Sequence, residues 1–151
     1  MWNFSGIASP FYANCLIFDT VVIFVYGGYG VKSTSDLVAL IDQHLLSQSG
    51  AVIDYPFGPE PTVYKVAGKM FAWIAVREDT PVLTVKAAPA DVEFLVGEFP
   101  SITPGYHMNK RHWITIRMDG QLQRGMLEQL ASASYHLVVS GLSKAQQSAL
   151  K

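Results

Sequence analysis

The stretch "TVYKVAGKMFAWIAVREDTPVLTVKA", residues 62–87, decides the fold of this chain. It contains three runs rich in β-branched and aromatic residues, at 62–66, 69–76 and 81–87. The first two runs are separated only by Ala-Gly and the last two by the polar turn Arg-Glu-Asp-Thr, which is typical of hairpins. We therefore predict three consecutive strands that pair in an antiparallel meander.

Helical patterns lie on both sides of these strands. Leu37, Ile41 and Leu45 are spaced along one side of a helix within residues 33–50. Because the later segments form hairpins and do not alternate strand with helix, the expected order α-β-β-β-α-β-α predicts an α+β fold. In that fold the helices pack on one face of an antiparallel sheet. The other expected elements are a loop at 51–61, a helix at 89–99, a loop to 105, a strand at 112–118, a helix at 122–142 and a short turn capped by Ser143.

The composition indicates one folded domain without disulfides. Half of the 151 residues are hydrophobic and 15% are charged, which is too apolar for a disordered chain. A single cysteine excludes an intramolecular disulfide and a cysteine-based zinc cluster, and it favours a reducing, cytoplasmic location. Residues 1–64 carry one basic and five acidic side chains, whereas residues 65–151 carry ten basic and seven acidic ones. Contact with a polyanion is therefore expected to be local and sensitive to salt.

Residues 1–33 differ in character from the rest of the chain. The apolar run from Leu16 to Tyr26 is 11 residues long, shorter than the roughly 20 that a membrane span needs, and Asp19 interrupts it. No basic residue precedes it, as a secretory signal would require. Three alternatives stay open: an extra strand or disordered extension, a weakly membrane-associating segment, or a natural start near Val31. We expect the domain itself to comprise residues 34–151. We expect no membrane among its partners.

Period-two alternation assigns the residues of the strand at 112–118 to two faces. Ile114, Ile116 and Met118 share one face, which we expect to point into the core. Trp113 and Arg117 then share the opposite face. If Lys65 and Lys86 lie on that same face, the sheet carries a basic patch beside Trp113.

The densest group of polar and aromatic side chains precedes this strand. Cations beside a tryptophan can contact phosphate while the indole stacks on a base, and an asparagine can read a base edge. The ordinary alternative is that Trp113 packs under the loop, that the cations are solvated and that the asparagine bonds to backbone. Two histidines without further donors predict no metal site. The group consists of Tyr106, His107, Asn109, Lys110, Arg111, His112 and Trp113.

Four segments in order resemble the MmcQ/YjbR family over residues 34–145. They are "DYPFGPEPTVYKVAGKMFAWI", "LTVKAAP", "FPSITPGYHMNKRHWITIRMDG" and "ASYHLVVSGL". The resemblance implies a frataxin-like (CyaY-like) arrangement of sheet and helices, also similar to double-wing DNA-binding domains. Residues 1–33 lie outside the family pattern. The resemblance implies site residues at His107, Asn109, Lys110, Arg111, His112 and Trp113, supported by Lys65, Lys69 and Lys86.

We therefore predict a non-catalytic, cytoplasmic DNA-binding domain without metal or cofactor. The alternatives are a small-molecule or drug-binding domain, with an aromatic pocket lined by Trp73, Trp113, Tyr64 and Phe57, and a protein-interaction adaptor. A concave apolar cavity favours the small-molecule alternative, and a convex positive wing favours nucleic acid. The full predicted site comprises Lys65, Lys69, Lys86, Tyr106, His107, Asn109, Lys110, Arg111, His112, Trp113 and Arg117.

Overall fold

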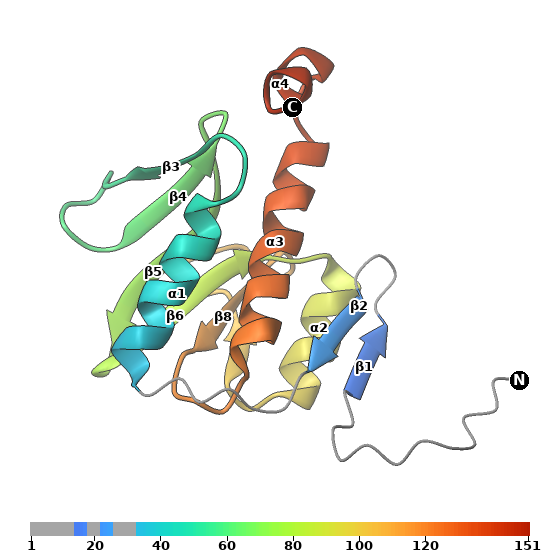
Figure 1. Ribbon diagram of the computed structural model, residues 1–151. Helices are drawn as coiled ribbons and strands as arrows, with labels where there is room; N and C mark the ends of the chain where they lie inside the picture. Colours follow the sequence, from blue (N-terminus) through green and yellow to red (C-terminus); the bar gives the residue numbers. More distant parts are fainter. Residues whose placement is uncertain (1–13, 18–21, 26–32) are drawn as a thin grey trace, which may run out of the picture.

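The computed structural model describes residues 14–17, 22–25 and 33–151, and it shows a helix layer packed on a sheet (Figure 1). The sheet has six strands in the order β3-β4-β5-β6-β8-β7, and every neighbouring pair is antiparallel. The helix layer lies on one face, as predicted for this α+β fold. The strands are β3 (Ala51–Asp54), β4 (Thr62–Val66), β5 (Lys69–Arg77), β6 (Thr80–Lys86), β7 (Ile102–Pro104) and β8 (Trp113–Arg117). The helices are α1 (Thr34–Leu46), α2 (Pro89–Glu98), α3 (Arg124–Ser140) and α4 (Lys144–Ala149).

The meander predicted for residues 62–87 is confirmed, but two strands lie where loops were expected. β3 pairs with β4, and β7 pairs with β8, so both strands extend the sheet at its edges. They have four and three residues, which is too short for an alternating pattern to be recognised beside prolines. Their partner strands, more than their own residue types, hold them extended.

The described parts of the predicted N-terminal extension form a separate hairpin. β1 (Asn14–Ile17) and β2 (Val22–Val25) pair with each other in an antiparallel two-stranded sheet. The remaining residues up to 32 lie outside the described part of the chain. None of the helices in the described residues is long and apolar enough to cross a membrane.

Local signals in the sequence set the helix ends. The Ser33 hydroxyl accepts a hydrogen bond from the Asp36 N–H, which satisfies a free donor in the first turn of α1. Pro89 occupies the first turn of α2, where a missing N–H costs nothing. Ser143 and Gln146 form a capping box at the start of α4, in the segment predicted to be a capped turn.

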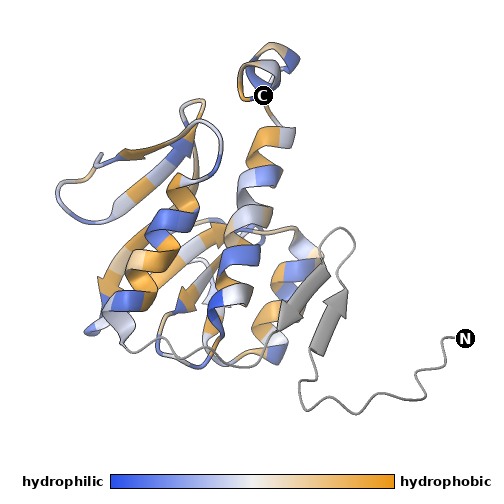
Figure 2. Ribbon diagram, in the orientation of Figure 1, coloured by the Kyte–Doolittle hydropathy of each residue, from blue (hydrophilic) through white to orange (hydrophobic). Residues whose placement is uncertain are grey.

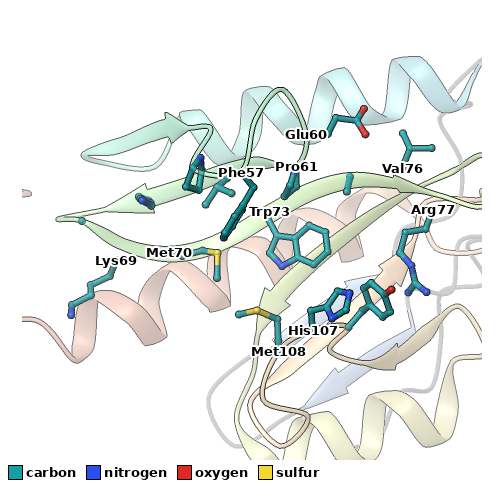
Figure 3. Close-up of a pocket in the computed structure, with 16 residues that line it drawn as sticks. Phe57, Glu60, Pro61, Lys69, Met70, Trp73, Val76, Arg77, His107 and Met108 are labelled. Carbon is teal, nitrogen blue, oxygen red and sulfur yellow. The ribbon is translucent and has the colours of Figure 1, made fainter.

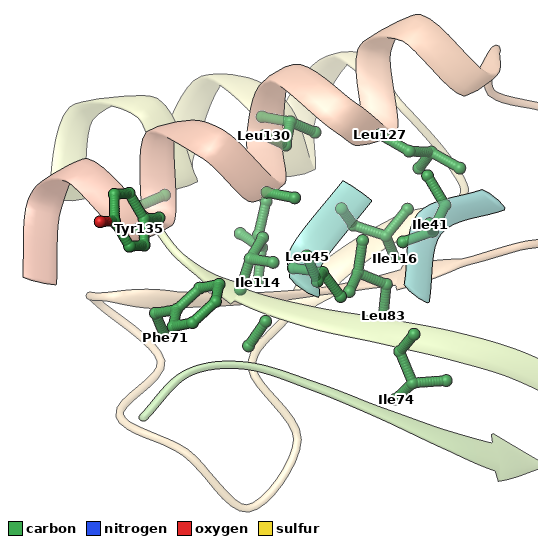
Figure 4. Packing of buried hydrophobic residues seen from close by; sticks show 14 of the residues in the cluster. Ile41, Leu45, Phe71, Ile74, Leu83, Ile114, Ile116, Leu127, Leu130 and Tyr135 are labelled. Carbon is green, nitrogen blue, oxygen red and sulfur yellow. The ribbon is translucent and has the colours of Figure 1, made fainter. Parts of the chain in front are cut away.

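The main core lies between the sheet and helices α1, α2 and α3 (Figure 4). α1 and α3 alternate between hydrophobic and hydrophilic residues along their length (Figure 2), as expected of helices that cover a core with one side. Ile114, Ile116 and Met118 are buried in this core, which confirms the face assigned to them. Phe71 and Tyr135 pack edge to face, with ring centroids 5.4 Å apart.

A buried serine joins α3 to the sheet. The Ser134 hydroxyl accepts a hydrogen bond from the Lys86 N–H at 2.7 Å and donates one to the Phe71 carbonyl at 2.5 Å. The side chain is fully buried, so no water can replace either bond. Ser134 therefore fixes α3 against β5 and against the end of β6.

The face of the sheet opposite these helices, which we call the open face, carries a second apolar cluster. Val63, Trp73 and Val82 form it, and Met70 and Ala75 pack against it. In the strand register Val63 lies opposite Trp73, and Trp73 lies opposite Thr84. The cluster therefore runs across the three strands of the meander, β4, β5 and β6.

Candidate functional site

A groove of about 810 Å³ lies along this second cluster on the open face (Figure 3). Val63, Met70, Trp73 and Ala75 line its floor. One wall comes from the loop between β3 and β4, and the other from the loop between β7 and β8. The wall residues are Pro56, Phe57 and Pro61 on one side, and Tyr106, His107 and Met108 on the other. The charged lining residues are Glu60, Lys65, Lys69 and Arg77.

Trp73 forms the centre of the floor. Val63 and Thr84 lie opposite it in the register, and Val63 and Val82 pack with it in the second cluster. Only 8% of Trp73 is exposed, and Figure 3 shows the indole between Met70 and the loop that carries His107. Phe57, by contrast, is 77% exposed at the rim. The groove thus offers one firmly held ring in its floor and one accessible ring in its wall.

The β7–β8 loop is fixed over the open face by hydrogen bonds to β8. The Gly105 N–H donates to the Trp113 carbonyl at 2.7 Å, and the Tyr106 N–H donates to the Thr115 hydroxyl at 3.0 Å. Thr115 shares a buried hydrogen bond of 2.9 Å with Thr84. Because these contacts link the loop to two strands, the wall of the groove has a defined position above the floor.

Three side chains contact one another in series at the end of the groove near the C-terminus of β5, with the Tyr106 and His107 rings tilted by 55°. The Arg77 guanidinium carbon lies 3.5 Å from the centroid of the Tyr106 ring. The His107 ring lies next to the Tyr106 ring, with centroids 3.9 Å apart. The backbone of His107 has a positive φ of 54°. A guanidinium that stacks through its flat face keeps its N–H edges available for hydrogen bonds.

The charges around the groove are partly neutralised. Lys65 forms an ion pair with Asp54, and this hydrogen bond lowers the pKa of the Asp54 carboxyl despite the opposing effect of desolvation. Lys69 and Arg77 form no ion pair with the described residues. Since β5 rises about 3.3 Å per residue, these two cations lie roughly 26 Å apart along the strand, at opposite ends of the floor.

Four of the predicted site residues line the groove. They are Lys65 and Lys69 from the β4–β5 hairpin, and Tyr106 and His107 from the β7–β8 loop. The elements that carry them are far apart in the sequence, and the sheet brings them to one concavity. Lys110 and Arg111 instead line a shallower depression of about 570 Å³ beside α2, together with Val92 and Glu93.

The expectation of an accessible indole at Trp113 is wrong. Trp113 is only 8% exposed, and it packs beneath the β7–β8 loop against Gly105. It does lie on the face that alternation assigned to it, but the loop covers that part of the face. The small-molecule alternative placed both Trp73 and Trp113 in its pocket, and of the two only Trp73 is among the described lining residues of the groove.

The predicted basic patch beside Trp113 does not form either. Lys86 lies opposite Trp113 in the register, whereas Arg117 lies opposite Val82, four residues further along β6. This separation is about 13 Å at the usual rise of a strand. Arg117 also pairs with Asp119 at 3.6 Å. The open face therefore carries separated cations, not one patch.

Of the other two predicted residues, Asn109 bonds within the loop through its side chain and His112 through its backbone. The Asn109 side-chain oxygen accepts a hydrogen bond from the Arg111 N–H at 3.0 Å, which is a local turn contact. The His112 N–H donates to the Asn109 carbonyl, and the His112 carbonyl accepts from the Ala87 N–H. No group of three or more metal-ligating side chains occurs among the described residues.

Sequence reasoning missed most of the other residues that line the groove, among them Arg77, Met70 and Met108. Arg77 was placed in a turn, yet it ends β5, and alternation from Trp73 through Ala75 would have put it on the same face. Tyr64 was expected in the aromatic pocket but lies in the main core, where its hydroxyl donates to Asp42 at 2.6 Å. Alternation with Val63, which lies on the open face, places Tyr64 on the core side.

The chemistry of the groove is that of a binding site. Its lining residues within the described chain include no serine, threonine or cysteine, and the side chain beside His107 is that of Tyr106. The apolar floor can take up an apolar surface, and the rim offers cations and one carboxylate, Glu60. Such a site can hold and orient a molecule.

Known proteins that are similar to the chain share this fold. The sequence model of the YjbR family matches residues 46–137. The chain is 39% identical to the uncharacterised protein YbdF of Escherichia coli O157:H7, over 62% of this chain and 76% of that protein. It is 29% identical to the uncharacterised protein YjbR of Escherichia coli K12, over 72% and 92% of the two chains.

Two crystal structures are also similar. The Deinococcus radiodurans protein DR2400, with a domain of the DUF419 family, has a TM-score of 0.66 and 34% identity, covering 78% of this chain and 87% of that one. A protein from Pseudomonas syringae has a TM-score of 0.57 and 26% identity, covering 66% and 96%. Together with the match of the family model over more than half of the sequence, these similarities show that the chain belongs to the YjbR family.

Proposed function

We propose that this protein is a non-catalytic binding module that takes a small, flat, largely apolar molecule into the groove over Trp73. The observation that carries this proposal is the concave apolar floor between two loops. Its volume of about 810 Å³ lies in the range typical of small-molecule sites. Trp73 and Phe57 supply ring surfaces, and Met70 and Met108 supply flexible side chains that adapt to a ligand's outline.

The topology of the floor disfavours an extended peptide as the occupant. β5 pairs with β4 on one side and with β6 on the other, so its backbone donors and acceptors are already used. A peptide that joins a sheet needs a free strand edge, which the floor of the groove does not offer. The occupant must therefore be recognised by side chains, as small molecules are.

A fluorescence titration with N-phenyl-1-naphthylamine, a neutral probe that brightens in apolar sites, tests the proposal. The Ala75→Phe variant fills the floor without removing core atoms, so we expect it to weaken probe binding by about tenfold or more. The matched control Ala39→Phe adds the same ring at an exposed position of α1 and should leave binding unchanged. Absence of binding to the wild type, or equal binding to Ala75→Phe, overturns the proposal.

DNA binding is the second candidate, and a different observation favours it. Lys110 and Arg111 are exposed on the β7–β8 loop, and neither forms an ion pair with the described residues. Two unneutralised cations on one loop can contact phosphate groups. Anisotropy titrations with duplex and single-stranded DNA across a salt series test this. Binding at low salt that is lost in the Lys110→Ala, Arg111→Ala double variant supports it, and no binding at low salt removes it.

A further inference from the structure

We infer that the ligand of the groove is an anion, with its ring system over Trp73 and an acidic group bound by Arg77. The inference rests on the proposed function and specifies its ligand. Arg77 lies four residues beyond Trp73 on β5 and lines the same groove. At about 3.3 Å per residue the two Cα atoms are roughly 13 Å apart, which leaves room for an aromatic ring system between the indole and the guanidinium.

Arg77 is already oriented for this role. Its guanidinium stacks on Tyr106 at 3.5 Å from the ring centroid, and Tyr106 is held in turn by its backbone bond to Thr115. Stacking occupies the flat face of the guanidinium, and its N–H donors point outward in the plane. Because two parallel N–H groups match the two oxygens of a carboxylate or sulfonate, the edge of Arg77 can bind such a group in a bidentate manner.

The balance of charge in the groove also favours an anion. Among the described lining residues, Lys65 is neutralised by Asp54, whereas Lys69 and Arg77 have no acidic partner within an ion-pair distance. Glu60 is the one acid among the lining residues of the described chain. An acidic group on the ligand therefore supplies the charge that Arg77 lacks, while a cationic ligand would meet repulsion.

A pair of matched probes isolates this contribution. The probe 8-anilinonaphthalene-1-sulfonate has the ring framework of N-phenyl-1-naphthylamine plus one sulfonate. The Arg77→Met variant keeps an unbranched apolar side chain but removes the charge and the donors. We expect it to weaken binding of the sulfonate probe by about tenfold or more, because hydrogen bonds to charged groups are the strong ones. Binding of the neutral probe should change by less than about twofold, since it makes no such bond.

Two further variants sharpen the test. Arg77→Lys keeps the charge but loses the planar fork, so it should recover only part of the affinity for the sulfonate probe. Arg124→Met, which removes an arginine paired with Glu128 at the start of α3, should alter neither titration. Raising the salt concentration should weaken the binding of the sulfonate probe and leave the binding of the neutral probe unchanged.

The outcomes separate the inference from the function on which it rests. Selective loss of the sulfonate probe in Arg77→Met supports an anionic ligand. Unchanged binding of that probe, or an equal loss of both probes, overturns the inference while the groove itself stays a binding site. If neither probe binds to the wild-type protein, the proposed function fails first.

Discussion

Replacing Gly105 by alanine tests how closely the β7–β8 loop must approach the sheet. Gly105 is buried, and its N–H donates to the Trp113 carbonyl at 2.7 Å. A Cβ atom added there would lie 2.6 Å from the Trp113 Cβ, 3.0 Å from its carbonyl oxygen and 3.1 Å from the Met108 Cβ. None of these atoms is the far end of a flexible side chain, so the backbone of the loop must move.

The expected cost has two parts. Forcing one extra methyl group into a well-packed site costs about 1–3 kcal/mol. Moving the loop also weakens the hydrogen bond between Gly105 and Trp113, which contributes about 0.5–1.5 kcal/mol. We therefore expect Gly105→Ala to lower the free energy of unfolding by roughly 2–4 kcal/mol. Because Tyr106 and Met108 move with the loop, the affinity for N-phenyl-1-naphthylamine should fall as well.

Urea denaturation followed by circular dichroism measures this change, and the chain offers a matched control. Gly97 lies near the end of α2 with no atom within 4 Å of an added Cβ. Gly97→Ala should stabilise the protein by about 0.5–1 kcal/mol, because alanine is the better helix former. If the free energy of unfolding of Gly105→Ala lies within about 0.5 kcal/mol of the wild-type value, the close approach of loop and strand is refuted.

Three further substitutions test other contacts by the same denaturation assay. Ser134→Ala should cost about 1–3 kcal/mol, since it leaves a buried N–H and a buried carbonyl without their partner; a loss below about 0.5 kcal/mol would contradict this. Thr115→Val should cost a similar amount and also weaken probe binding, because the hydroxyl holds the Tyr106 N–H; unchanged values of both would contradict the role of Thr115. Burial, and then the hydrogen bond to Asp42, raise the pKa of the Tyr64 hydroxyl above its usual value near 10. The folded state therefore keeps a proton that the unfolded state loses, so the stability of the wild type relative to Tyr64→Phe should fall above about pH 10, and a pH-independent difference would contradict this.

Much of the architecture follows from the sequence because its signals are local. The strands of residues 62–87 are read from β-branched runs and short polar turns, and the helices from spacing and capping residues. β3 and β7 escape this reading, since a strand of three or four residues carries too little pattern. What makes them strands is pairing with β4 and β8, the strands that follow them in the chain across the loops 55–61 and 105–112.

The site is harder to predict, because it depends on which loop covers which strand. Alternation placed Trp113 on the open face correctly, but exposure depends on the loop above it, which no local pattern specifies. The same loop leaves Trp73 beside a concavity. The cluster of polar and aromatic residue types predicts Tyr106 and His107, and the family resemblance implies Lys65 and Lys69. Arg77 escapes prediction because the expected strand ends one residue too early.

The physical basis of the account is a division of the sheet into two faces. One face is covered by helices and filled by the main core, and it stabilises the fold. The other carries a small apolar cluster between two loops, and the partly buried Met70 and Ala75 and the exposed Phe57 leave apolar surface there that can still be covered. Under the proposed function, an apolar ligand covers this surface.

The most direct test is the response of the three tryptophan indole N–H signals in a two-dimensional NMR spectrum, assigned by single Trp→Phe variants. When N-phenyl-1-naphthylamine is added, the account predicts that the Trp73 signal shifts strongly and saturably. The Trp113 signal, from an indole beneath the β7–β8 loop, should shift much less. A spectrum in which Trp73 does not move while the probe is bound would show that the ligand lies elsewhere and would contradict the central claim.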